Sequence, residues 1–110
     1  MTIDDVIERV AAVCDRLPEV TRRDDPLSTV FERKRRIVAY VLEYDGVQMV
    51  VVNADPDEIH ALVAGGHPYF KPGSGRNRLG VVIDDETDWD QLEELVEDSF
   101  RLIAPKRLQS

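Results

Sequence analysis

A chain of 110 residues with 43% hydrophobic and 33% charged residues can bury one modest core, which excludes a disordered chain and leaves no room for two domains. The formal net charge of -8 disfavours contact with nucleic acid or anionic membranes unless the basic residues cluster. No apolar run approaches the roughly 18 residues of a membrane span, and the acidic start MTIDDVIERV does not have the pattern of a signal peptide. We therefore expect one domain over residues 1–110.

The first segment is predicted to be a helix. Its apolar residues recur at steps of three and four and form one stripe: Ile3, Val6, Ile7, Val10, Val13, Cys14 and Leu17. Thr2 is a suitable N-cap, and Pro18 is a suitable stop. Cys14 is the single cysteine, which excludes an internal disulfide and favours the cytoplasm. The polar segment EVTRRDDP that follows is predicted to be a loop.

Three strand candidates come next, and they are LSTVFE, RIVAYVLEY and VQMVVVN. The pair Asp45-Gly46 separates the last two strands and is typical of a tight hairpin turn. The basic residues 33–36 fall between the first two strands. They are therefore expected at or near the tip of a hairpin.

A second, short helix is predicted to begin after Asp55, because Asp55, Pro56 and Glu58 supply a cap, a first-turn proline and a returning carboxylate. Gly65-Gly66 is expected to end this helix. The segment HPYFKPGSGRNR is predicted to be a loop with room for one short strand, and LGVVID to be a further strand.

The last helix is predicted to begin at Asp88, which together with Gln91 forms its cap. The order is therefore helix, three strands, helix, one or two strands, helix. Meandering strands with helices gathered on one side predict a two-layer α+β fold, with an antiparallel sheet and helices mainly on one face.

The C-terminal third, VIDDETDWDQLEELVEDSFRLIAPKRL, resembles the ending of the MmcQ/YjbR-like family of small bacterial proteins, which are often labelled DNA-binding. The motifs that carry the resemblance are 88–90 (DWD), 98–102 (DSFRL) and 104–108 (APKRL). Looser counterparts extend the resemblance over nearly the full chain. It implies the same order of helices and strands, with two strands before the last helix, and DNA binding. Arg78 stands where many similar sequences carry a tryptophan.

The basic hairpin residues are the first candidate site, because the planar fork of an arginine pairs well with phosphate oxygens. Successive strand residues point to opposite faces, so about half of the four can face one partner. The alternative is a hairpin tip that its charges keep soluble, or an edge that they protect from aggregation. These residues are Arg33, Lys34, Arg35 and Arg36.

The loop KPGSGRNR is the second candidate, because glycine amides can form an anion nest beside Lys71, Arg76 and Arg78. It lacks the Gly-Lys-Ser/Thr of a P-loop, and Ser74 lacks the spacing of a nucleophile elbow, so a flexible connector is the alternative. If the hairpin and this loop share a face, seven bases converge. The predicted nucleic-acid-binding residues are Arg33, Lys34, Arg35, Arg36, Lys71, Arg76 and Arg78.

No catalytic or metal-binding set is predicted. His60 and His67 are the only histidines, and with one cysteine they cannot form a zinc cluster. The acids of the segment 84–90 do not have the spacing of a calcium loop. Tyr69 and Phe70, near the basic loop, are candidates for stacking on bases.

These patterns predict a non-enzymatic protein without a cofactor that binds nucleic acid or another polyanion and no membrane. The alternative is a protein-interaction module or a homodimer that does not bind nucleic acid. It would use a sheet edge or the acidic last helix, and the overall charge favours it.

Overall fold

The computed structural model describes residues 1–73 and 75–104, and it orders their elements as the sequence patterns predict, with one additional strand. The elements are α1 (Ile3–Cys14), β1 (Thr21–Asp24), β2 (Thr29–Arg33), β3 (Arg36–Tyr44), β4 (Val47–Asn53), α2 (Pro56–Ala64), β5 (Tyr69–Phe70), β6 (Arg78–Ile83) and α3 (Trp89–Ile103). Within these residues, no helix is long and apolar enough to cross a membrane.

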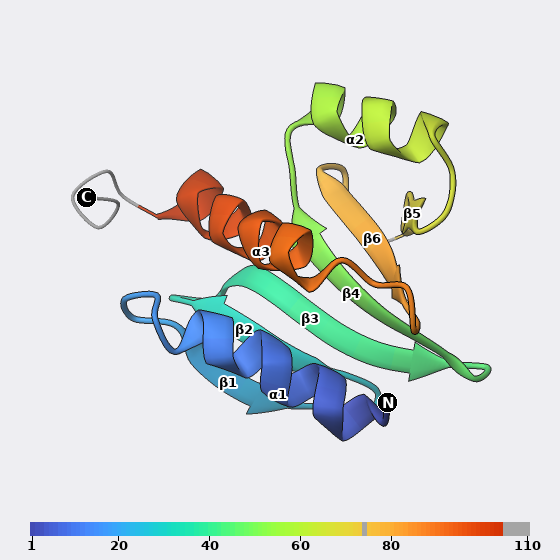
Figure 1. The fold of residues 1–110 in the computed structure, drawn as a ribbon. Coiled ribbons are helices and arrows are strands. Elements are labelled where there is room, and N and C mark those ends of the chain that lie inside the picture. The colour runs from blue at the N-terminus through green and yellow to red at the C-terminus, as the bar shows by residue number, and fades with distance from the viewer. Residues whose placement is uncertain (74, 105–110) are drawn as a thin grey trace.

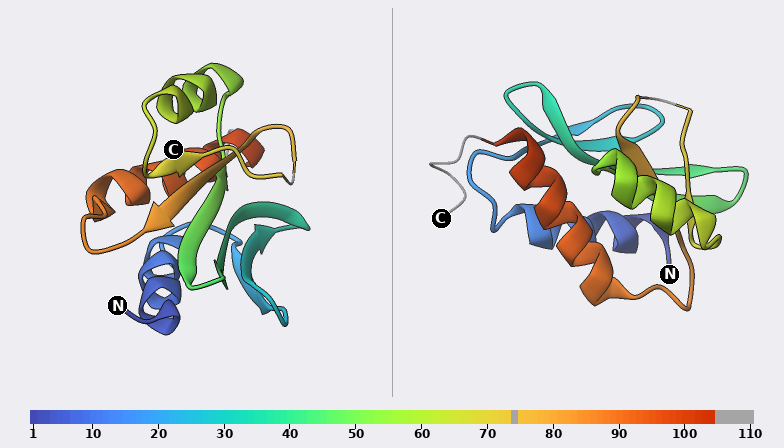
Figure 2. Two further views of the ribbon diagram at one scale, coloured as in Figure 1. Left: turned by 90° about the vertical axis from the view of Figure 1, so that its right-hand side faces the viewer. Right: turned by 90° about the horizontal axis from the view of Figure 1, so that it is seen from above.

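The strands form a sheet in the order β1-β2-β3-β4-β6-β5, and every neighbouring pair is antiparallel. Figure 1 shows α1 and α3 in front of this sheet, and the view from above in Figure 2 places both helices on the same side of it. The short α2 lies beside β5 and β6, at the end of the molecule opposite to α1. The predicted two-layer α+β class with an antiparallel sheet is confirmed.

The prediction of a loop over EVTRRDDP is wrong, because Thr21–Asp24 is a strand. Thr21 lies opposite Glu32, and Asp24 lies opposite Thr29. All four residues of β1 are exposed, so the strand has no apolar alternation by which the sequence could reveal it. Side-chain contact between β1 and β2 comes from an ion pair, from Arg23 Nε to Glu32 Oε1 at 3.2 Å, and not from apolar packing.

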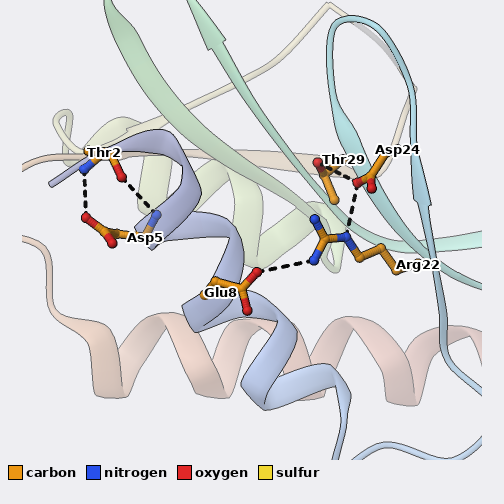
Figure 3. A network of polar contacts seen from close by, with 6 residues as sticks. All are labelled: Thr2, Asp5, Glu8, Arg22, Asp24 and Thr29. Atoms are coloured by element: carbon orange, nitrogen blue, oxygen red, sulfur yellow. Dashed lines mark hydrogen bonds and ion pairs between the residues drawn. The ribbon is translucent and has the colours of Figure 1, made fainter.

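The predicted capping residues Thr2, Asp55 and Asp88 are confirmed at the three helix starts, whereas the described contacts include no returning carboxylate from Glu58. Thr2 and Asp5 form a reciprocal capping box at α1, which Figure 3 shows. At α2 the carboxylate of Asp55 accepts a hydrogen bond from the backbone N–H of Asp57 at 3.1 Å, and Pro56 occupies the favoured first position. At α3 Asp88 accepts a hydrogen bond from the backbone N–H of Gln91.

Arg22 ties α1 to the first hairpin. Its guanidinium contacts Glu8 Oε1 on α1 at 3.3 Å and Asp24 Oδ1 at 3.0 Å, and Thr29 Oγ1 donates to the same Asp24 oxygen (Figure 3). The hydrogen bond from Arg22 holds the pKa of Asp24 below its ordinary value. Because the charged groups of this network are exposed, their ion pairs orient β1 more than they stabilise the fold.

The core lies between the two long helices and one face of the sheet. Ala39 is opposite Val52, and Val52 is opposite Leu79, so strand pairing puts their side chains on the same face. Against this face pack the stripes of α1 and α3, whose central residues are Val10 and Val96. The helical periodicity and the strand alternation are therefore satisfied by one buried layer.

Ser99 is a fully buried polar residue of α3 that joins this helix to two strands. Its hydroxyl donates to the carbonyl of Val38 at 2.5 Å and accepts from the backbone N–H of Asn53 at 2.9 Å and from Asn53 Nδ2 at 3.1 Å. The same amide group donates to the carbonyl of Ile37 at 2.6 Å. The pairing of β3 with β4 begins only at Ala39, so these bonds satisfy backbone groups that the sheet leaves unpaired.

Replacing Ser99 with alanine is expected to lower the free energy of unfolding by about 2–3 kcal/mol, because buried backbone groups of Val38 and Asn53 then lose a partner. Urea denaturation followed by circular dichroism measures the change. Glu94→Ala, at an exposed position of the same helix, is the control and is expected to stay within about 0.5 kcal/mol of the parent. A loss that small for Ser99→Ala would contradict the structural role given to the hydroxyl.

Cys14 is expected to be inert in the folded protein. Burial, with a smaller effect of Asp15, raises the pKa of its thiol to about 12, and the thiolate is the reactive form. The native chain at pH 8 should not react with Ellman's reagent, whereas the chain in denaturant should react at once. Full labelling of the native protein within minutes would show that the thiol is accessible.

Candidate functional site

Arg33 belongs to the fold rather than to an exposed basic cluster. Its side chain is 5% exposed, and its Nη2 contacts Glu19 Oε2 at 2.9 Å. Its Nε is buried without a hydrogen-bond partner among the described residues. If the Arg33 side chain lost its contact with Glu19, its buried guanidinium would lack a counter-ion, and the cost of removing it from water would not be compensated. The pair with Glu19 therefore keeps Arg33 in place.

Lys34 and Arg35 form the turn between β2 and β3, at the hairpin tip where the sequence placed them. Both have positive φ, 48° and 70°, in a two-residue loop. Hairpins of this kind favour Asn-Gly or Asp-Gly, as in the turn at Asp45-Gly46. A residue other than glycine in this region costs about 1 kcal/mol or more. The turn therefore carries two exposed cationic residues whose backbone conformation is unfavourable for any residue other than glycine.

Three of the predicted arginines share a pocket at one end of the sheet. Strand pairing explains the grouping, because Arg36 begins β3 and Arg78 begins β6 opposite Asn53, the end of β4. The pocket has a volume of about 260 Å³ and is lined by Arg35, Arg36, Ile37, Asn53, Arg78 and Ile103. Residues separated by more than 40 positions in the chain thus form one positively charged hollow.

Among the described residues, Ile103 and Tyr40 contact the arginines of this pocket. Arg36 Nη1 donates to the carbonyl oxygen of Ile103 at 3.5 Å, at the C-terminal end of α3, where the helix dipole favours a cation. The guanidinium of Arg78 lies 5.9 Å from the centre of the Tyr40 ring. A guanidinium has five N–H donors, more than these contacts to described residues use, so it can also donate to an anion.

Lys71 and Arg76 line a different pocket, beneath α2. The other residues of its lining are Pro56, Ile59, His60, Val63 and Ala64. Lys71 Nζ donates to the carbonyl of Gly75 at 2.9 Å, which closes the loop on itself. The seven predicted bases therefore divide into the arginine pocket, the turn residue Lys34 beside it, the buried Arg33 and this second pocket. Ser74 lies outside the described residues, as does the 105–108 part of the APKRL motif.

Basic and acidic residues lie at opposite ends of the strands. The arginine pocket lies at the end where β2 finishes and β3 begins. Asp45, in the next hairpin turn, and the exposed acids 84–86, which follow β6, lie at the opposite end. Asp55 and Asp57, at the start of α2, are acids nearer to the arginine end, where Asp55 is engaged in capping.

Tyr69 and Phe70, the candidates for stacking on bases, are both half-buried in β5. Tyr69 packs against the core, and burial raises the pKa of its hydroxyl. Phe70 lies on Gly80, where an added Cβ would come within 2.3 Å of its ring. Tyr40, in β3, is an aromatic residue beside the arginine pocket, because it lies next to Arg78. The sequence feature that could have indicated this place for Tyr40 is that its strand begins with Arg36.

The described residues contain no cluster of three or more histidine, cysteine, aspartate or glutamate side chains that could hold a metal ion. His67 forms a pair with Asp84, from Nε2 to Oδ2 at 3.0 Å, next to the turn after β6. The arginine pocket is thus a set of cations with an aromatic neighbour, an arrangement that is chemically suited to an anion.

A gain in stability is expected from the double substitution Lys34→Asn and Arg35→Gly. It supplies the residues that the turn prefers and should add about 1–2 kcal/mol to the free energy of unfolding. Urea denaturation gives the value. Asp45→Asn, in a turn that already has suitable residues, should change stability by less than about 0.5 kcal/mol. Destabilisation by the double substitution would mean that the two cations make stabilising contacts that outweigh the backbone cost.

Comparison with known proteins gives two findings. A family model described as YjbR matches residues 15–102. A crystal structure of Deinococcus radiodurans protein DR2400, with a DUF419 domain, superposes with a TM-score of 0.77 at 22% sequence identity, covering 92% of this chain and 80% of that one. At this identity the likeness shows the fold alone. No curated protein matches the sequence.

Proposed function

This chain belongs to the YjbR family, and we propose that it is a non-enzymatic, cytoplasmic protein that binds nucleic acid or another polyanion. The proposed contacts are Arg35, Arg36 and Arg78, with Lys34 beside them at the turn. The DNA-binding label that accompanies the family resemblance supplies the class of ligand, and the arrangement of the arginines supplies the site. Lys71, Arg76 and Arg33 are not in the proposed centre.

The observation that carries the proposal is that three arginines from two separate segments line one pocket. A guanidinium presents several N–H donors in a fixed plane, which matches the oxygens of a phosphate. Two further features support a polynucleotide: Tyr40 stands next to Arg78, and the turn carries Lys34 outward from the sheet. Arg35 belongs to both the pocket and the turn, so a polyanion bound in the pocket would also be close to Lys34.

The overall charge predicts how such binding would behave. A net charge of -8 repels a polyanion at long range, so the attraction depends on the local field of the pocket. Neutralising about three phosphates of duplex DNA gives a slope of roughly -3 for the logarithm of affinity against the logarithm of salt concentration. We therefore expect weak, strongly salt-dependent binding that is not selective for sequence.

The test is fluorescence anisotropy with a labelled DNA duplex and a labelled single strand, each at low and moderate salt. Arg36→Ser with Arg78→Ser should weaken binding at least tenfold and flatten the salt dependence, because two phosphate contacts are lost. Arg9→Ser with Arg16→Ser removes the same charge from the helical layer and is the matched control. That control should bind within about twofold of the parent.

Lys71→Ser with Arg76→Ser separates the pocket from general electrostatics, because it removes two cations from the pocket beneath α2. A smaller loss than for Arg36→Ser with Arg78→Ser is expected. Equal losses in all three double variants would overturn the proposed site and leave only a net-charge effect. Absence of binding by the parent chain at low salt would overturn the proposed function.

A further inference from the structure

The sheet has a second face that neither α1 nor α3 covers (Figures 1 and 2). Strand pairing fixes its residues: Tyr40 is opposite Val51, Leu42 is opposite Met49, and Tyr44 is opposite Val47. In β6, Val82 continues the row of Leu42 and Met49. Every one of these side chains is apolar or aromatic, although the face is not the one that packs against the helices.

The exposure of this face is graded. Val51 and Val30 are buried, at 1% and 4% exposed, yet they are not part of the core under the helices. Leu42, Met49 and Val82 are half-buried, and Tyr44 is 73% exposed. Apolar side chains in a continuous row across three strands form a patch of the kind that marks an interaction site.

The size of the face fits a protein partner. The strands β2, β3, β4 and β6, about 4.8 Å apart and about 17–30 Å long, offer roughly 430 Å² in plan, and the accessible area is larger because the side chains project. A standard interface buries about 800 Å² of each partner. With the turns at its rims, the face approaches what a stable dimer needs.

The charges at the two ends of the strands indicate which partner fits. One end carries Arg35 and Arg78, and Arg78 lies on this face because it is two residues before Gly80 in the row of Tyr40. The other end carries Asp45 and the acids 84–86. A second sheet laid on the first with its strands reversed would bring each arginine end to an acidic end.

We infer that this apolar face binds a second copy of the chain, with the two sheets packed face to face. The twofold axis crosses the strands near the row of Leu42 and Met49, so the arginine end of each copy meets the acidic end of the other. Such an interface is self-complementary, as a twofold dimer requires. It uses the face of the sheet, not the edge or the acidic last helix, and it does not depend on the proposed function.

The first test is the molar mass of the full chain, by light scattering after size exclusion and by sedimentation equilibrium, without nucleic acid. A species of twice the 12.5 kDa chain mass is expected at micromolar concentration. Met49→Glu places a charge in the middle of the interface and should raise the dimer dissociation constant at least 100-fold. Leu102→Glu, at an exposed apolar position on α3, is the matched control and should leave the dimer intact.

A second test locates the axis without depending on a destabilising variant. Met49→Cys should be joined to its own copy by a short bismaleimide crosslinker, because the residue lies next to the axis, while Leu102→Cys should not. Arg78→Glu should weaken the dimer about tenfold, since it puts an acid against the acidic end of the partner.

Each outcome decides the inference. A parent chain that stays monomeric at 200 μM overturns it, and protection of the face by added DNA in that case would assign the face to nucleic acid. A dimer that persists in folded Met49→Glu overturns it by placing the interface elsewhere. Tightening by Arg78→Glu overturns the reversed arrangement of the strands. Crosslinking through Met49→Cys alone, with the expected change in mass, supports it.

Discussion

The buried hydroxyl of Ser99 holds α3 against the sheet where β3 and β4 have stopped pairing. Without a side-chain partner, the carbonyl of Val38 and the backbone N–H of Asn53 would be buried and unsatisfied, which no amount of apolar packing compensates cheaply. The same contact fixes how α3 leaves the core. Its last turn arrives beside Arg36 and contributes Ile103 to the arginine pocket, so the pocket depends on a hydrogen-bonded node of the core.

The antiparallel meander explains how an acidic chain presents a positive end. Consecutive hairpin turns lie at alternate ends of a sheet, so the β2–β3 turn and the start of β6 share one end, and the β3–β4 turn and the end of β6 share the other. Arg35 and Arg78 fall on the first end, and Asp45 falls on the second. The strand connections therefore place basic residues at one end of the sheet and acidic residues at the other, although acids outnumber bases in the chain as a whole.

The sequence predicts those parts of this fold that rest on local chemistry. Capping residues such as Thr2 and Asp88 predict the helices, and Asp45-Gly46 predicts a hairpin, because each of these residues interacts with backbone groups only a few residues away. The strand β1 could not be predicted, since its residues are all exposed and only pairing with β2 orders them. Local signals were sufficient wherever the stabilising partner lies nearby in the chain.

The grouping of the basic residues could not be predicted for the same reason. Arg33 and Arg36 lie directly opposite each other in the hairpin, yet one is buried against Glu19 and the other lines the pocket beside Ile103, because each contacts a different segment that is distant in the chain. The register itself shifts between Phe31 and Glu32. Whether Arg78 joins Arg36 or Lys71 depends on how β6 pairs with β4, which is a non-local choice.

Arg78 connects the two surfaces of this protein, since its guanidinium lines the arginine pocket while its neighbour Tyr40 belongs to the apolar face. With both proposals in force, a polyanion that engages Arg78 would compete with the acidic end of a second copy for the same charge. By thermodynamic linkage the competition is reciprocal, so self-association would weaken polyanion binding by the factor by which the polyanion weakens the dimer. The position of one arginine between two surfaces thus makes them dependent on each other, even though the apolar contacts and the phosphate contacts are made by different atoms.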